Sequence, residues 1–167
     1  MRPLDETGGA GSPTERFDAE RYVQSIWAPK VLQGGVAGAR DVDLAASAPA
    51  FFKGSGKVMK VDTASRAGVA LVDLAPGDGK ADVALQVGPV TRGTALRDAL
   101  GLGFSDFDSQ IDYANVAGKL NERAVAGLAS LKEPAALEGK TVSFAGAGAV
   151  NVDGLLDLLP VTLEIAP

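Results

Sequence analysis

The chain has 167 residues, a net charge of −5 and no histidine or cysteine. The missing side chains exclude Ser-His-Asp and Cys-His nucleophile systems, disulfide bonds and zinc sites of the usual Cys/His kind. The acidic balance opposes binding to phosphate backbones, so we expect no nucleic-acid partner. No run of about 18 apolar residues occurs, so the sequence predicts no membrane-spanning segment.

The first part of the chain is predicted to be a tether followed by a small helical subdomain. Residues 1–16 are rich in Gly, Pro and Thr, which is typical of a flexible tether. Two helices are predicted within residues 17–54, namely Phe17–Ala28 and Asp43–Phe52. Asp18 can cap the first helix, and Pro29 should end or kink it. A glycine-rich loop, Gln33–Arg40, is expected between the two helices.

The remaining residues, 55–167, contain segments with the alternation of apolar and polar side chains that marks half-buried strands. Five strands are predicted: Lys57–Thr63, Ala67–Leu74, Ala81–Val87, Thr141–Ala147 and Val161–Ile165. A helical insert, residues 94–131, separates the third strand from the fourth. Thr94 should open its short first helix and Gly101 should close it, and a long helix is predicted at Tyr113–Leu131.

This order of elements is that of the OB fold. We therefore predict an α+β protein. Its centre is a five-stranded, mostly antiparallel OB-like barrel, with a small N-terminal helical domain and a helical insert between strands three and four.

The turn between the third strand and the short helix is the candidate ligand site, formed by Arg92, Thr94, Arg97 and Asp98. A helix opened by Thr94 has free N–H groups that favour an anionic or hydroxyl-bearing partner. Arg92 lies at the positive end of the same helix, so a negative partner is expected, either an acid of the fold or a ligand. The alternative is that Arg97 and Asp98 make only structural ion pairs.

Two acidic segments are candidates for a cation site, and neither pattern is specific. Asp106, Asp108 and Asp112 crowd one loop and could hold a hard cation, although Asp112 could instead cap the long helix. Residues 77–82, GDGKAD, resemble the second half of a calcium loop, but a hairpin turn is favoured because Asp-Gly is a strong turn signal. We expect no metal and no cofactor.

Three segments resemble a bacterial family of predicted periplasmic lipoproteins with a domain of unknown function. They are YVQSIWAPKVL (Tyr22–Leu32), LQVGPVTRGTALRDAL (Leu85–Leu100) and FDSQIDYANVAGKLNERA (Phe107–Ala124). The similarity runs from about Phe17 to Ile165, and Gly88–Asp98 is its most specific part. The resemblance implies an OB-like barrel joined to a small helical domain, and it supplies no catalytic residues.

The resemblance also implies an exported protein held at the membrane through a lipidated cysteine. We expect the full-length gene to encode a leader that ends in this cysteine shortly before Arg2. The resemblance further implies a link by gene neighbourhood, because the genes of similar proteins often lie near those of ribose-type sugar ABC transporters. Components of such a transporter are therefore the expected partners, and the expected location is the periplasm.

Three hypotheses about function follow. The first is a lipid-anchored accessory or binding module, of unknown ligand, that works beside a sugar transporter. The second is a small enzyme that uses carboxylates, which the lack of histidine and of a paired-carboxylate motif disfavours. The third is an oligonucleotide-binding barrel, which the acidic charge and the 5% aromatic content disfavour.

Overall fold

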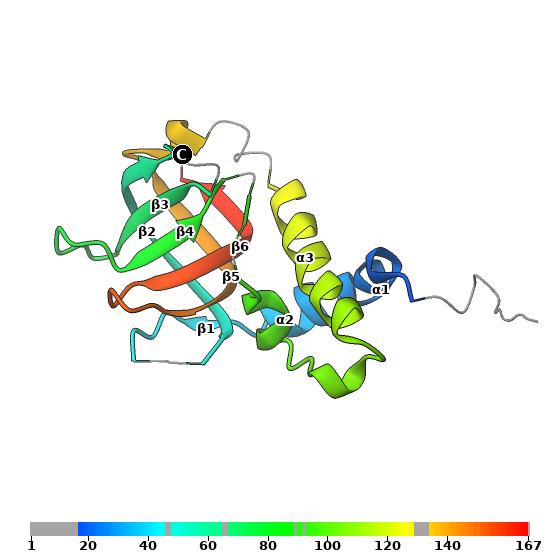
Figure 1. Cartoon of the computed structure of the whole chain (residues 1–167). Coiled ribbons are helices and arrows are strands. Elements are labelled where there is room, and N and C mark those ends of the chain that lie inside the picture. Colours follow the sequence, from blue (N-terminus) through cyan, green and yellow to red (C-terminus); the bar gives the residue numbers. More distant parts are fainter. Residues whose placement is uncertain are drawn as a thin grey trace, which may run out of the picture.

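The computed structural model describes residues 17–45, 48–64, 67–88, 90–91, 93–128 and 134–166. It consists of a β-barrel with a layer of helices packed on one side (Figure 1). The strands are β1 (Arg40–Asp41), β2 (Ala50–Asp62), β3 (Val69–Leu74), β4 (Val83–Gln86), β5 (Thr141–Val150) and β6 (Leu156–Ile165). The helices are α1 (Ala19–Ile26), the π-helix η2 (Trp27–Val36), α2 (Ala95–Ala99), η3 (Phe104–Asp106), α3 (Gln110–Ala126) and η5 (Pro134–Leu137). The expected tether, residues 1–16, lies outside the described residues.

The barrel closes because the long strand β2 pairs on both of its sides. Its first half is antiparallel to β5 and its second half is antiparallel to β3. The ring is completed by β3–β4 and β6–β5, both antiparallel, and by β4–β6, which is parallel. The two-residue strand β1 flanks β2 in parallel. The predicted five-stranded, mostly antiparallel barrel, with helices between its third and fourth strands, is confirmed.

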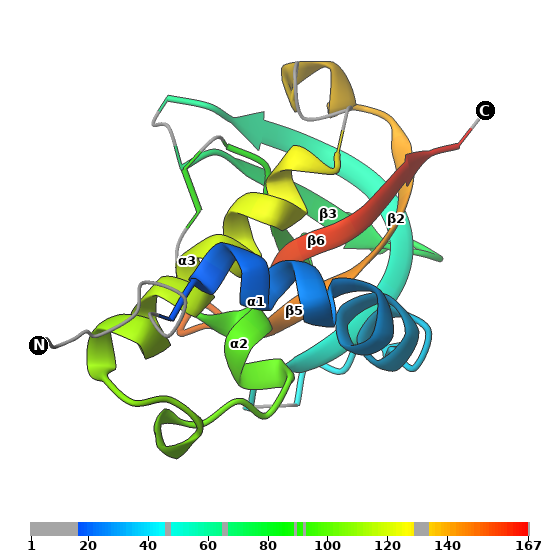
Figure 2. The ribbon, with the colours of Figure 1, turned by 90° about the vertical axis from the view of Figure 1, so that its right-hand side faces the viewer.

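Alternation along the strands sends side chains into two separate cores. Leu85 and Leu158 point into the barrel, where they join Phe52, Val72 and other buried apolar side chains. Leu159, the next residue of β6, points outward and packs against the helices together with Ala147 of β5. The helical layer lies across the outer face of β5 and β6 (Figure 2). Helix α1 packs against α3 within this layer, and both contribute to one apolar cluster.

The N-terminal helix begins as predicted and continues further than predicted. Asp18 caps α1, because its Oδ1 accepts a hydrogen bond from the Arg21 N–H at 3.1 Å. The segment does not end at Pro29: α1 passes directly into the π-helix η2 at Trp27, and η2 runs on to Val36. The loop predicted from Gln33 is therefore wrong for residues 33–36. Complete burial of Val31 stabilises the continuation beyond Pro29.

The predicted helix Asp43–Phe52 is also wrong. Ala50–Phe52 belongs to β2, and the turn before it is closed by the Ala45 N–H, which donates to Asp43 Oδ1 at 2.9 Å. Phe52 lies opposite Gly146 of β5 and is fully buried in the barrel. Long-range pairing and this burial override the local helical preference of an alanine-rich segment. The expected domain boundary after residue 54 therefore falls inside β2.

The long helix predicted in the insert is present as α3, but it spans Gln110–Ala126 and not Tyr113–Leu131. Val116, Leu120 and Ala124 are among its buried residues. The residue that caps α3 is Ser109 and not Asp112, because Ser109 Oγ accepts the Asp112 N–H at 3.1 Å. Gly101 follows the C-cap of α2 with φ of 78°, the left-handed conformation that favours glycine.

We predict that Gly146→Ala destabilises the barrel by about 2–3 kcal/mol, because a Cβ there would overlap the backbone of Leu159 and Pro160 in β6. Neither neighbour can move as a flexible side chain could. The matched control is Gly118→Ala in α3, where nothing lies within 4 Å of the new methyl group. The control should gain up to about 1 kcal/mol from helix propensity. Urea unfolding of both variants checks the contrast, and equal midpoints would contradict it.

Candidate functional site

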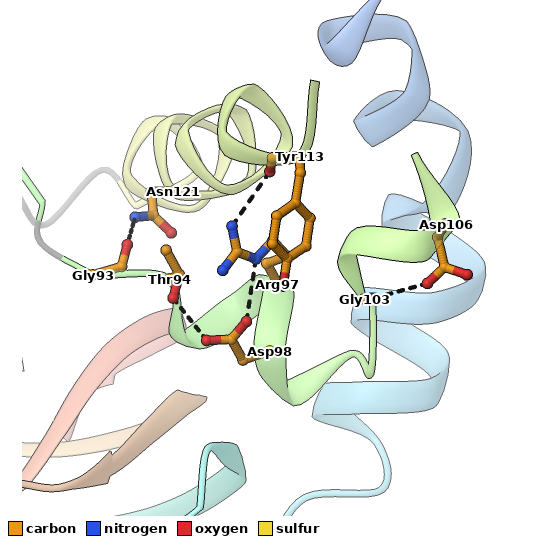
Figure 3. A network of polar contacts seen from close by, with 8 residues as sticks. All are labelled: Gly93, Thr94, Arg97, Asp98, Gly103, Asp106, Tyr113 and Asn121. Atoms are coloured by element: carbon orange, nitrogen blue, oxygen red, sulfur yellow. Dashed lines mark hydrogen bonds and ion pairs between the residues drawn. The ribbon is translucent and has the colours of Figure 1, made fainter. Parts of the chain in front are cut away.

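Arg97 is at the centre of a polar network between α2 and α3 (Figure 3). Its guanidinium carbon lies 3.6 Å from the centroid of the Tyr113 ring, and its Nε pairs with Asp98 Oδ1 at 3.1 Å. A third contact joins its Nη1 to the Tyr113 carbonyl oxygen at 3.4 Å. Only 12% of the Arg97 side chain is exposed. The guanidinium is thus enclosed by groups of the protein itself.

Thr94 is the N-cap residue of α2, as predicted, and its hydroxyl extends the network. Its hydroxyl donates to Asp98 Oδ2 at 2.7 Å, and its side chain accepts no hydrogen bond from the helix. The two oxygens of Asp98 therefore bind Arg97 and Thr94 respectively. Helix α2 has five residues, so it offers little free N–H surface for an anion.

Asn121 anchors the segment before α2 to helix α3. Its Nδ2 donates to the Gly93 carbonyl oxygen at 3.1 Å, and the residue is 5% exposed. Its Oδ1 has no hydrogen-bond partner in the part of the chain that the structure describes. The helical pattern marked this position only as part of α3, so its polar role was missed.

The structure brings Thr94, Arg97 and Asp98 together, while Arg92 lies outside the described residues. The three side chains bind one another, which favours the structural alternative for Arg97 and Asp98. A ligand-binding role for this group stays a prediction.

We predict that Arg97→Ala lowers the free energy of unfolding by about 2–3 kcal/mol, because the ring stacking is lost and Asp98 loses its charge partner. Arg97→Lys should recover only part of this, since an ammonium group cannot stack as a planar fork does. The exposed Arg21→Ala is the control and should stay within about 0.5 kcal/mol of the parent. Thermal and urea unfolding measure all three. Unchanged stability of Arg97→Ala would restore the ligand-site hypothesis.

The acidic residues of the α2–α3 connection serve local structure. Asp106 Oδ2 accepts the Gly103 N–H at 2.7 Å, and Asp108 is exposed. Asp106, Asp108 and Asp112 do not gather their oxygens at one point. Within the described residues, the carboxylates that do so are Asp73, Asp78 and Asp82, whose oxygens lie within 4.8 Å of one another.

This second acidic group lies in the β3–β4 hairpin and holds its turn. Asp73 accepts hydrogen bonds from the N–H groups of Asp78 at 3.1 Å and Gly79 at 2.8 Å. Asp82 accepts the Leu74 N–H at 3.0 Å, and Asp78 accepts the Lys80 N–H at 2.9 Å. The carboxylates are engaged by backbone donors, as a hairpin requires. The backbone donors to Asp73 hold the pKa of its carboxyl below its usual value of 3.8.

We predict that Asp73→Asn destabilises the hairpin at neutral pH and that its effect fades in acid. The folded pKa of Asp73 is lowered, so its stabilisation is complete above pH 3.8 and is lost as the pH falls through the folded pKa. The difference in unfolding free energy between parent and variant should therefore be constant from pH 7 to about pH 5 and shrink below pH 3.8. Urea unfolding at a series of pH values measures it. A difference that grows in acid would contradict the assignment.

A groove of about 450 Å³ crosses the outer face of the barrel over β3 and β4. Its apolar lining consists of Val69, Leu71, Ala84, Val152 and Leu155, and its polar lining consists of Lys60, Asp62, Asn151, Asp153 and Asp157. Asn151 orders the β5–β6 loop at one end of the groove, because its Oδ1 accepts the N–H groups of Asp153 and Leu155 at 2.8 and 3.2 Å. The fully exposed Val152 lies at the tip of this loop.

The groove suits a ligand that is neither anionic nor a single metal ion. Among its described lining residues, three carboxylates outnumber one lysine, which disfavours phosphate groups. These carboxylates do not converge as those of the β3–β4 hairpin do. Sequence reasoning missed the groove because its residues come from β2, β3, β4, β6 and a loop, and none of them stands out in the sequence alone.

The order and pairing of the strands are those of an OB-fold barrel, and we call the groove over β3 and β4 the barrel-face groove. An OB-fold protein from Thermotoga maritima, with a crystal structure at 1.90 Å resolution, matches with a TM-score of 0.63 and 18% identity. The match covers 90% of this chain and 99% of the other. No curated protein matches the chain.

The family model for DUF2291, described as predicted periplasmic lipoproteins, matches residues 38–164, so the chain belongs to this family. The family and its periplasmic location, both inferred from the resemblance, are thereby confirmed, although the match begins at residue 38 and so does not cover the segment Tyr22–Leu32. In the described part of the chain, every helix is too short or too polar to cross a bilayer.

Proposed function

We propose that this protein is a non-catalytic binding module, held at the membrane by a lipid, that takes a neutral polyhydroxylated ligand into the barrel-face groove. The observation that carries the proposal is the lining of the groove. Its separated carboxylates can accept hydrogen bonds from several hydroxyl groups. Its floor of Val69, Leu71 and Leu155 can contact the C–H face of a sugar ring.

The position of the groove supports the same proposal. In OB folds, the face of the second and third strands and the loop between the fourth and fifth often bind oligosaccharides or oligonucleotides. Here those elements are β3, β4 and the β5–β6 loop. An oligonucleotide is disfavoured because the lining is net acidic and its described residues include no aromatic side chain for base stacking.

The family supports a periplasmic location for such a module. A periplasmic lipoprotein that binds a sugar would work beside a sugar transporter, whose components are the proposed partners. A lipidated cysteine upstream of Arg2 would be the proposed anchor. The residues before Phe17 would then set how far the domain can extend from the membrane surface.

We predict that neutral sugars bind in this groove and that Asp153→Asn weakens the binding about tenfold or more, since a hydrogen bond to a charged group contributes about 1.5–3 kcal/mol. Isothermal titration with ribose, glucose, a disaccharide series and ribose 5-phosphate measures the affinities. Leu71→Glu should abolish binding by occupying the floor, and Asp41→Asn, on another face, is the matched control.

Two results would contradict this proposal. The first is preferential binding of ribose 5-phosphate or an oligonucleotide over every neutral sugar. The second is turnover of a bound sugar derivative that depends on the groove carboxylates, which would favour the enzyme hypothesis instead.

A further inference from the structure

The aromatic side chains of this protein are distributed unevenly. The chain has nine of them, and five form a connected series of ring contacts at the outer end of the helical layer. We call Phe17, Tyr22, Phe104, Phe107 and Tyr113 the aromatic cluster. Its ring centroids are 5.5–5.9 Å apart. All five are intermediate or exposed, whereas Trp27, Phe52 and Phe144 are buried.

Core packing accounts for only part of the aromatic cluster. Phe17, Tyr22 and Phe107 pack at the margin of the apolar cluster between the helices and the barrel. Phe104 does not belong to that apolar cluster, and half of it is exposed to solvent. A half-exposed aromatic residue supported by other rings from behind is typical of the anchor residues in protein interfaces.

The surroundings of the aromatic cluster are acidic. Asp18 follows Phe17 directly, and Asp106 and Asp108 flank Phe107; all three are exposed. Burial and the nearby charge of Asp106 raise the pKa of Tyr22. Arg97 lies against Tyr113 but is paired with Asp98, whereas Arg21 of α1 is exposed. Among the described residues named here, the three exposed aspartates of this rim outnumber this one exposed arginine, and such an acidic balance disfavours anionic lipid headgroups.

The aromatic cluster also lies where the domain joins the rest of the chain. Phe17 is the first described residue, and sixteen residues precede it. In a periplasmic lipoprotein this end of the domain is the one connected to the membrane. Figure 2 shows the start of α1 beside the α2–α3 connection at this end of the helical layer.

We propose that the aromatic cluster and its acidic rim dock the domain onto a membrane-associated protein whose facing surface is apolar and ringed by Lys or Arg. Phe104 is the anchor side chain, and Asp108 supplies charge complementarity at the rim. Strands β3 and β4, which contribute to the lining of the groove, lie away from the helical layer (Figure 1), and the groove shares no lining residue with the aromatic cluster.

The test places the photo-crosslinking residue benzoylphenylalanine at position 104 of the full-length lipoprotein in its own cells, and at position 152 as the exposed control. We expect a discrete cross-linked protein from position 104 and not from 152. The cross-linked peptide, read by mass spectrometry, should carry Lys or Arg close to the attachment point. Asp108→Lys should lower the yield about tenfold, while Asp41→Lys should leave it unchanged and thermal melting should be the same for both.

Several outcomes would overturn the proposal. The proposal fails if position 104 gives no more protein cross-link than position 152, or if the cross-linked protein is a second copy of this chain. It also fails if the partner peptide contains no basic residue, or if Asp108→Lys leaves the cross-linking yield unchanged. Adducts with lipid alone, supported by binding to phosphatidylethanolamine–phosphatidylglycerol vesicles, would instead assign the aromatic cluster to the bilayer. The groove variant Asp153→Asn should keep the cross-link, so this proposal and the proposed ligand can fail separately.

Discussion

The barrel depends on close approach between the backbones of its strands. At Gly146 the chain of β5 shifts register against β6, and the backbone of Leu159 and Pro160 occupies the place of a side chain. Gly56 of β2 meets the carbonyl group of Asp73 in the same way, at the point where β2 leaves β5 and turns toward β3. In a small barrel, one strand can pair with a different strand along each half of its length only if it bends sharply. Glycine positions permit that bend because they carry no side chain.

Closure of the barrel then sets where the helices can pack. Because β5 and β6 alternate their side chains, one pair of strands contributes Leu158 to the interior and Leu159 to the helical layer. Helix α3 covers this outer face, and Asn121 and Arg97 fix the segment that leads into it from β4. The polar network is therefore best understood as the joint between barrel and helices, with its charges balanced internally.

The sequence predicts those parts of the fold whose signal is local. Alternation around Val83 and Leu85 and the helical spacing of Val116 and Leu120 both reflect burial on one face, and both predictions are confirmed. The start of β2 could not be predicted, because Ala50–Phe52 lacks alternation and becomes a strand only through pairing with β5. The groove and the aromatic cluster were missed for the same reason, since each joins residues far apart in the chain.

A chain without histidine or cysteine lacks the side chains most used for nucleophilic and acid–base catalysis near neutral pH. It keeps the carboxylate, cationic, hydroxyl and aromatic side chains that bind ligands and partner proteins. Many of its carboxylates accept hydrogen bonds within the fold. Those of the β3–β4 hairpin bind backbone N–H groups, as do Asp18 and Asp106 beside the aromatic cluster and Asp62 in the groove. Asp153 and Asp108 are exposed at the groove and beside the aromatic cluster respectively. The groove and the aromatic cluster share no residue, and strands β3 and β4 lie away from the helical layer. If the ligand and the docking partner proposed above both bind, neither contact would have to be released for the other to form, because they would use different elements of the fold.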